Sequence, residues 1–328
     1  MHRAIHVAAG LILFAFVLSV LPPHIHPSYA EEEPGPGVRA SEHVALRLKA
    51  AEKAIEKRLL SERLGLRFYG YLDGSYTQNF NNPSNGINEL RIFDVNSNAF
   101  RPNLAQAVLE REAKATSNWL DRVGFKVKFN VGRDSGFIGG VDLSTLADFQ
   151  EVYLQYLAPI GSGLNVQLGQ SNSLVGYEVV ESPRNPNYSR SWLFGLGQPF
   201  TTRGARASYE FNEHVSLAVG VIAFINSARG NTEYDPLLES ALTIAPSGKA
   251  KLTIYGLAGP RPGAPGTNGG DILQIGGVFS FQATERGSIV LESYYANQPN
   301  SSLVSQAGNA RWNGVAGYAI YDVTDKWG

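Results

Sequence analysis

Apolar and polar residues alternate along most of the chain that follows residue 65. The segment VGFKVKFNVG at 123–132 shows the pattern, because every second residue from Phe125 is aromatic or branched aliphatic while Lys126 and Lys128 lie between them. Successive side chains of a β-strand leave opposite faces of the sheet. The pattern therefore predicts a strand with one face in an apolar environment and the other face in water.

The same period of two recurs often enough to predict twelve strands. We expect them at residues 66–79, 103–113, 122–132, 148–158, 164–172, 204–211, 214–225, 237–245, 249–258, 271–282, 287–296 and 311–323. The segment 214–225 is the least regular, because apolar residues such as Ile222 occupy both of its faces. Long connections, such as 173–203, alternate with tight turns around Asn212 and Ser247. One end of the predicted sheet thus has short turns, and the other has long loops.

Three features favour a transmembrane barrel over a water-soluble β-sandwich, whose strands also alternate. Several predicted strands have 9–12 residues, which suits a tilted strand that crosses the hydrocarbon layer. The polar face has long charged side chains that suit a wet lumen, and the strand ends have aromatic residues where an interfacial girdle would place them. These aromatic residues are Phe80, Tyr156, Phe211, Phe281 and Tyr295. The asymmetry between short turns and long loops adds to these three features.

In lipid, an open sheet edge would leave backbone groups unpaired, so the sheet must close. We therefore predict an all-β fold for residues 65–328, a transmembrane antiparallel β-barrel of at least twelve strands.

The N-terminus has the features of an export signal. Arg3 precedes an apolar run at 8–21, and the small residues around Ala30 fit a signal-peptidase site. We expect residues 1–30 to be a cleaved signal peptide. An uncleaved anchor helix is the alternative, for which the apolar run is short. Residues 31–40 follow as an acidic linker rich in proline and glycine.

Residues 41–64 differ from the segments on both sides, because their apolar positions recur every three or four residues between arginine, lysine and glutamate. This spacing predicts a short N-terminal amphipathic helix with a narrow, coiled-coil-like seam. In one interpretation the helix is an oligomerisation stalk or a plug. In the other it is a solvated helix laid against the body of the protein, and the seam is too short to decide between them.

Composition and charge exclude several classes of function. The net charge of −1 over 328 residues gives no electrostatic reason to bind nucleic acid. Cysteine is absent, so an exported form draws its stability from packing and closure and not from disulfides. His214 is the one histidine in the predicted barrel, and it lies at a tight turn beside Glu213, where a polar residue is ordinary. A Ser-His-Asp hydrolase would need it as general base. We therefore expect no enzyme activity, no catalytic residue, no cofactor and no metal site.

The most specific motifs lie in the stretch LGQSNSLVGYEVVESPRNPNYSRSWLFGLGQPFTTRGARASYEF at 168–211. They are GYE at 176–178, ESPRNPNYSRS at 181–191 and QPFTTRGARASY at 198–209. Together with FYGYLDGSYTQNF at 68–80, they resemble the putative β-barrel porin-2 (OmpL-like) family of bacterial outer-membrane proteins. The similarity runs from about Leu66 to the end of the chain. The resemblance implies a pore-forming outer-membrane barrel and leaves its solute open.

The end of the chain departs from what is common in outer-membrane barrels. Such barrels commonly finish on a strand with a terminal aromatic residue, whereas YDVTDKWG at 321–328 ends in what resembles a turn into another strand. We therefore expect that the sequence lacks a C-terminal portion and that the complete barrel has more strands.

The connection at 173–203 combines acidic, basic and aromatic residues. Its candidate constriction residues are Glu178, Glu181, Arg184 and Arg190. If the segment folds into the lumen, these side chains would select solutes by charge and size, since charged rings are one route to selectivity. The alternative is an extracellular cap whose Arg–Glu pairs hold the loop together.

Alternation alone assigns further charged residues to the wall of the lumen. They are Lys126, Lys128, Glu151, Arg206, Glu210 and Glu292. The alternative is that they form ion pairs that fill a narrow, closed barrel. Because their signs are mixed, they predict neither anion nor cation preference.

These observations predict a porin of the bacterial outer membrane that lets small hydrophilic solutes diffuse through a water-filled barrel. Its expected partners are outer-membrane lipid and small solutes, with no nucleic acid. A homo-oligomer would form through the N-terminal helix or the barrel wall. The alternative function is a plugged structural or adhesion barrel without an open channel.

Overall fold

The computed structural model describes residues 64–138, 141–144, 146–225, 236–261, 270–301 and 308–323. They all belong to one compact unit, residues 58–328. The predicted signal peptide and linker lie outside the described residues, as does the predicted helix apart from Leu64. These assignments stay predictions.

All twelve predicted strands are present. They are β1 (Leu66–Thr77), β2 (Ala99–Arg111), β3 (Val123–Val131), β5 (Ala147–Ala158), β6 (Leu164–Asn172), β7 (Thr201–Asn212), β8 (Val215–Ile225), β9 (Leu237–Ser247), β10 (Ala250–Arg261), β11 (Gly270–Gln282), β12 (Gly287–Gln298) and β13 (Ala310–Tyr321). The prediction missed the short strand β4 (Val141–Ser144) and the short helices α3 (Ser135–Ile138), η1 (Ser182–Arg184) and α4 (Trp192–Gly197). In the described ranges no helix has the length and apolar character needed to cross a membrane.

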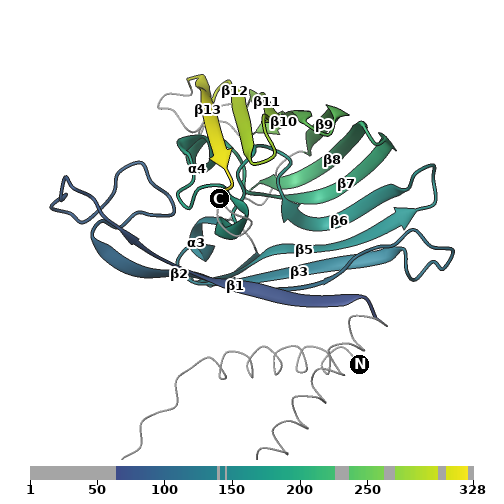
Figure 1. Ribbon diagram of the computed structural model, residues 1–328, viewed down its shortest axis with the longest axis horizontal. Coiled ribbons are helices and arrows are strands. Elements are labelled where there is room, and N and C mark those ends of the chain that lie inside the picture. The colour runs from purple at the N-terminus through teal and green to yellow at the C-terminus, as the bar shows by residue number, and fades with distance from the viewer. Residues whose placement is uncertain are drawn as a thin grey trace, which may run out of the picture. The chain divides into compact units, whose positions relative to one another are not determined.

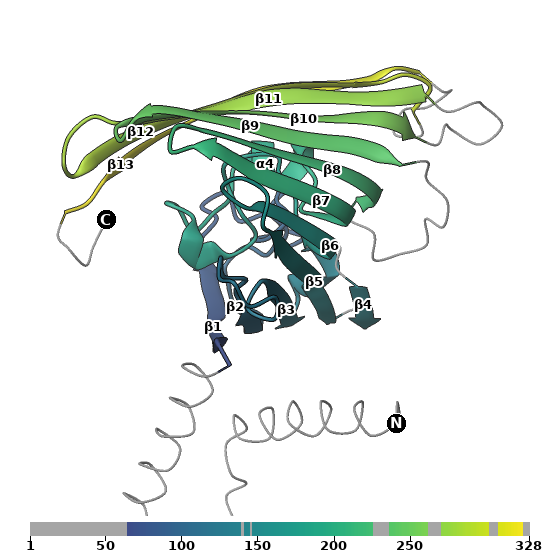
Figure 2. The same ribbon diagram turned by 90° about the vertical axis from the view of Figure 1, so that its right-hand side faces the viewer.

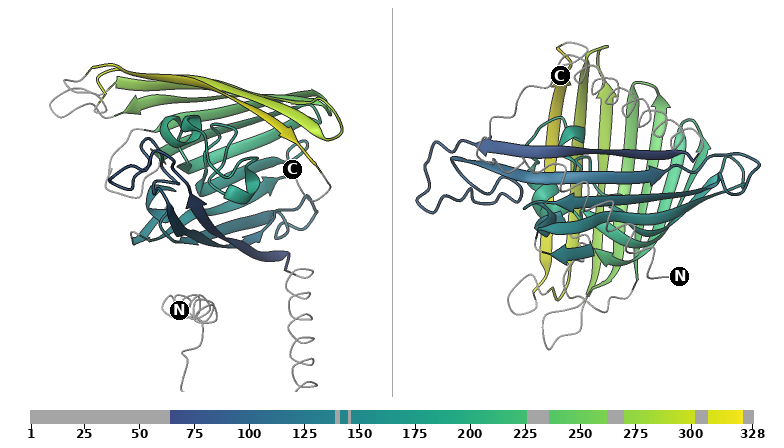
Figure 3. Two further views of the ribbon diagram at one scale, coloured as in Figure 1. Left: turned by 60° about the vertical axis from the view of Figure 1, so that its left-hand side comes forward. Right: turned by 90° about the horizontal axis from the view of Figure 1, so that it is seen from below.

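The twelve long strands form a meander in one sheet. Each pairs antiparallel with the next long strand along the chain, and β4 adds to β5 beside this path. The sheet curves strongly, so that β1–β3 and β10–β13 lie on opposite sides of the space that holds α4 (Figures 1, 2 and 3). Among the described residues, β1 pairs with β2 alone and β13 with β12 alone, so the sheet is open. The all-β antiparallel architecture is confirmed, while closure into a barrel stays a prediction.

The predicted alternation of connection lengths is present. Because successive long strands are antiparallel, every second connection lies at the same end of the sheet. Short connections at one end include 159–163 and 213–214, whereas 78–98, 132–146 and 173–200 are long and lie at the other end. The long-loop end therefore carries most of the irregular structure.

The two faces of the sheet differ in the way that the alternation predicts. On the convex face, the paired residues Leu154 of β5 and Leu168 of β6 are 62% and 65% exposed. The residues that alternate with them along the strands point to the concave face. Lys128 of β3 also points to that face, and its side chain is buried there. A barrel in lipid would require this arrangement, with apolar side chains outside and polar side chains inside.

A β-bulge modifies the alternation in β5. Lys128 pairs with Glu151 and Phe129 with Phe149, so Gln150 has no partner on β3. Gln150 and Glu151 are consecutive, yet both are buried on the concave face. A bulge reorients a side chain in this way, and it adds a polar group to the interior that strict alternation would place outside.

The concave face of the C-terminal strands differs from the polar face that the sequence predicts. Tyr255, Tyr294 and Tyr318 are buried there with Val175 in one apolar cluster. A second cluster consists of Ile222, Leu237, Leu257 and Ile272. The interior is therefore polar along β1–β7 and largely apolar and aromatic along β8–β13. This distribution also explains Ile222, whose apolar side chain points to the concave face.

Gly169 of β6 gives a test of the strand packing. Its φ is +137°, and a Cβ at this position would lie 2.2 Å from the carbonyl oxygen of Val152. We expect Gly169→Ala to lower the free energy of unfolding by about 1–3 kcal/mol, because an L-residue is strained in this conformation. Denaturant unfolding in lipid vesicles measures the effect. Gly256→Ala is the matched control, because its Cβ would meet its nearest atom at 3.5 Å. Equal losses in the two variants would contradict this packing.

Candidate functional site

The connection between β6 and β7, residues 173–200, lies on the concave side of the sheet, and we name it the excursion (Figures 1 and 2). It contacts the sheet on both sides of the concave space. One side is the polar inner face of β1–β7, the polar wall, and the other is the largely apolar inner face of β8–β13, the apolar wall. Glu181 contacts Lys128 of β3. On the opposite wall, the carbonyl oxygen of Gly197 accepts hydrogen bonds from Gln274 Nε2 at 2.9 Å and Trp312 Nε1 at 3.1 Å. The excursion therefore connects the polar wall to the apolar wall.

Ion pairs form a continuous ladder along the polar wall. Lys128 contacts both Glu151 and Glu181. Lys126 Nζ lies 3.6 Å from Glu151 Oε2 and 3.3 Å from Glu110 Oε2. The ladder then continues from Glu110 to an exposed arginine of β1. Charges of alternating sign thus run from the sheet surface to the buried contact with the excursion.

Glu181 is the most deeply buried acid of the ladder. Burial disfavours its charged form, but Lys128 and hydrogen bonds outweigh that effect and hold the pKa of Glu181 below its usual range. Gln150 Nε2, supplied by the bulge, donates to Glu181 Oε1 at 2.9 Å. Removal of either partner would therefore be costly, because it would leave an uncompensated buried charge.

Asp73 of β1 is a second anchor for the excursion. Its carboxylate accepts hydrogen bonds from Tyr188 Oη at 2.7 Å, from Ser182 Oγ, and from Asn103 Nδ2 of β2 at 3.3 Å. Ser182 begins the single turn η1. These bonds fix the tip of the excursion to the first two strands.

Glu178 caps helix α4 and does not face across the interior. Its carboxylate accepts a hydrogen bond from the backbone N–H of Ser191 at 2.9 Å and another from Ser191 Oγ. Ser191 is the N-cap residue, and its hydroxyl accepts from the N–H of Phe194 at 3.2 Å. A carboxylate here also complements the positive end of the helix.

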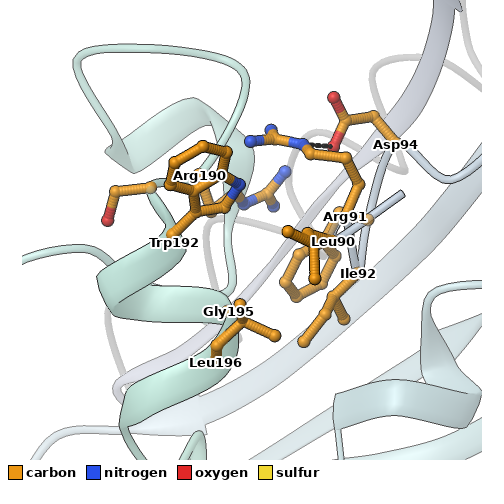
Figure 4. Close-up of a pocket in the computed structure, with 10 residues that line it drawn as sticks. Leu90, Arg91, Ile92, Asp94, Arg190, Trp192, Gly195 and Leu196 are labelled. Carbon is orange, nitrogen blue, oxygen red and sulfur yellow. Dashed lines mark hydrogen bonds and ion pairs between the residues drawn. The ribbon is translucent and has the colours of Figure 1, made fainter. Parts of the chain in front are cut away.

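Arg190 is buried between the excursion and the first long connection. Its guanidinium lies 4.5 Å from the ring centroid of Phe93 and donates hydrogen bonds to the carbonyl oxygens of Val180 and Tyr188. Figure 4 shows this region, with Leu90 and Ile92 facing Trp192, Gly195 and Leu196 of α4. Arg190 therefore holds the excursion in shape.

The four predicted constriction residues are thus placed separately. Glu178 and Arg190 make contacts within or beside the excursion, Glu181 contacts the polar wall, and Arg184 is exposed. Among the described residues, no two of the four form an ion pair with each other. Their role in selectivity stays a prediction.

The predicted lumen-wall residues lie mainly in the buried interior. Lys126, Lys128 and Glu151 belong to the ladder described above. Arg206 of β7 contacts Glu239 of β9 at 2.8 Å, and Glu292 of β12 accepts a hydrogen bond from Tyr255 Oη at 3.1 Å. Glu210 is exposed near the end of β7. The mixed signs thus arise mostly from paired groups.

Several site residues were missed by sequence reasoning. Gln106, Asn130 and Gln150 form a buried amide cluster, in which Gln106 Nε2 donates to Asn130 Oδ1 at 2.9 Å. Asn130 and Gln106 follow the period-two pattern, so alternation could have placed them. Gln150 could not be placed by alternation, because the bulge shifts the pattern at that residue.

Asp134, in the connection after β3, was also missed. It is 4% exposed, and in the described part of the chain its carboxylate has no hydrogen bond or ion pair. Burial raises the pKa of Asp134 to about 7; Asp73 and Asp94 act in the same direction and Arg190 opposes them. A buried carboxyl of this kind is a candidate for a functional site.

His214 has the position of a turn residue. It is exposed between β7 and β8, and its Nδ1 lies 2.9 Å from the carbonyl oxygen of Ala245. This contact attaches the turn to β9. Across the described ranges, no cluster of three or more histidine, aspartate or glutamate side chains has a geometry that could hold a metal ion.

We expect Asp134→Asn to change how stability depends on pH. The folded carboxyl keeps its proton to about pH 7, whereas an unfolded aspartate loses it near pH 3.8. Stability therefore falls as pH rises between these values, by at most about 1.4 kcal/mol per pH unit. The variant should match the wild type near pH 4 and be more stable than it at pH 8, as measured by denaturant unfolding. Asp121→Asn is the control, and a parallel pH profile for Asp134→Asn and the wild type would contradict this expectation.

No curated protein sequence matches the chain. The profile of the family described as "Putative beta-barrel porin-2, OmpL-like" matches residues 65–328, a range that covers every described strand. The predicted resemblance is therefore confirmed, and the chain belongs to the β-barrel porin-2, OmpL-like family.

Proposed function

We propose that the protein is an outer-membrane porin that lets small hydrophilic solutes cross by passive diffusion. The observation that carries this proposal is the division of one curved sheet into an apolar convex face and a concave face with a ladder of charged side chains. Apolar residues suit lipid, and ionised residues suit a hydrated path. Membership of a porin-like family supports the same function.

Closure of the sheet into a barrel is part of the proposal. Strands β1 and β13 are each twelve residues long and present backbone groups that pair on one side alone. In lipid, every unpaired backbone group costs several kcal/mol, so a membrane-spanning sheet must have no free edge. A cleaved N-terminal signal would deliver the chain to the outer membrane. An oligomer would form through the convex wall or the helix predicted at 41–64, which lies almost entirely outside the described residues.

The excursion is the proposed constriction. It occupies the concave side and is held against both walls, so a solute would have to pass along its surface. Lys126 and Arg184 would contribute charge to that path, since Lys126 keeps partial exposure and Arg184 is exposed.

A plugged structural or adhesion barrel is the second candidate. The observation that favours it is the burial of Lys128, Gln150 and Glu181, which leaves little water around the contact between the excursion and the polar wall. In that case the excursion would be a permanent plug.

Single-channel recording in planar bilayers separates the two functions. We expect discrete conductance steps from the wild type and larger steps after residues 178–192 are replaced by a short Gly-Ser linker, because the path becomes wider. The control replaces 114–120, a segment in the connection between β2 and β3, by a similar linker and should conduct like the wild type.

The outcomes of that recording differ for each idea. If the wild type gives no steps and the linker variant does, the excursion is a plug. If both give the same steps, the constriction proposal is wrong. If neither gives steps, the porin proposal is wrong.

The lipid-facing side has a separate test. We expect Leu154→Arg to lower the free energy of unfolding in lipid vesicles by about 2–4 kcal/mol, because a charge on the lipid face near the midplane carries this cost. Gln167→Arg, on the neighbouring strand and the concave face, is the control and should cost less. A protein that unfolds equally in both cases would not have its convex face in lipid.

A further inference from the structure

A cavity of about 730 Å³ lies at the long-loop end of β1, β2 and β3. This volume is within the range of about 300–1,000 Å³ that is usual for small-molecule sites. The cavity is separate from the paired charges of Lys128 and Glu181, which do not line it. Its polar lining residues come from three places in the sequence, namely Asp73, Arg101 with Asn103, and Arg133 with Asp134.

The acidic groups of this cavity are at its buried side. Asp73 and Asp134 are 8% and 4% exposed, and the neutral Asn103 is 3% exposed. Asp73 already accepts three hydrogen bonds, whereas the carboxylate of Asp134 has no hydrogen bond or ion pair among the described residues. The oxygens of this carboxylate are not sealed from solvent, so a ligand in the cavity can donate a hydrogen bond to them. A cationic donor fits best above about pH 7, where Asp134 has lost its proton, because Asp73 then adds a second carboxylate.

The basic groups of the cavity are at its more open side. Arg101 is half-buried and Arg133 is exposed, and both line the cavity. Two guanidinium groups that line one cavity attract an anion, and a carboxylate fits their planar geometry. The rest of the lining is mostly apolar and includes Phe93, Leu72 and Val131.

We propose that this cavity binds a small zwitterionic solute of amino-acid to dipeptide size, with its ammonium group toward Asp134 and Asp73 and its carboxylate toward Arg101 and Arg133. A solute with one charge would satisfy one side and leave the other unchanged. The site concerns binding alone, so it does not depend on an open channel.

Isothermal titration calorimetry of the full chain in detergent tests the proposal with three matched probes. Glycylglycine has both charges, glycylglycine amide has the ammonium alone, and N-acetylglycylglycine has the carboxylate alone. We expect glycylglycine to bind and each analogue to bind at least about tenfold more weakly, because each leaves one charged side of the site unpaired. Absence of glycylglycine binding, or equal binding of the three probes, would overturn the proposal.

Variants assign the two sides of the site. Asp134→Asn should weaken glycylglycine binding at least about tenfold, so that glycylglycine and N-acetylglycylglycine bind with similar affinity. In Arg101→Gln, glycylglycine and glycylglycine amide should bind with similar affinity. This variant tests the site even if Asp134→Asn fails to fold. Asp121→Asn, outside the cavity, should bind like the wild type. Unchanged glycylglycine binding in Arg101→Gln would overturn the proposal. If the wild type binds glycylglycine but gives no conductance steps, the porin proposal alone is wrong.

Discussion

The buried contact between Lys128 of β3 and Glu181 of the excursion is the interaction on which the interior depends. Both side chains are almost completely removed from water. Such charges are tolerated only when they are paired and when their remaining hydrogen-bonding groups are satisfied. Glu151 supplies a second carboxylate to Lys128, and the bulge at Gln150 supplies a donor to Glu181. The register of β5 against β3 and the position of the excursion are therefore mutually dependent.

The excursion is held differently on its two sides. Toward β1–β5 it is held by ion pairs and hydrogen bonds that centre on Asp73 and Lys128. Toward β10–β13 it is held by apolar and aromatic packing around Val175 and Tyr294, with hydrogen bonds to the carbonyl oxygen of Gly197. Salt and pH act on the first kind of contact and barely on the second.

The pattern of the sequence predicted the strands well because each strand has its own period of two. The same pattern placed Lys126 and Lys128 inside and their apolar neighbours outside, as the structure has them. The pattern could not place Gln150. A bulge depends on the register between two strands, so the sequence of one strand does not reveal it. The apolar inner wall was missed for a related reason. Tyr255 and Tyr294 pack on the concave face in one cluster with Val175, which is distant in sequence. The isolation of Asp134 likewise arises from how separate segments come together.

The meander has a consequence for how the molecule is made. Each long strand finds its partner in the strand that immediately precedes it, so most pairing contacts join residues close in sequence. Loop closure then costs little entropy at each step, and hairpins can form one after another along the chain. The contacts of the excursion do not obey this order, since Glu181 must meet a strand that comes earlier and Gly197 must meet strands that come much later. Seating of the excursion is consequently a late event, which waits until synthesis and pairing have brought β11 and β13 into place.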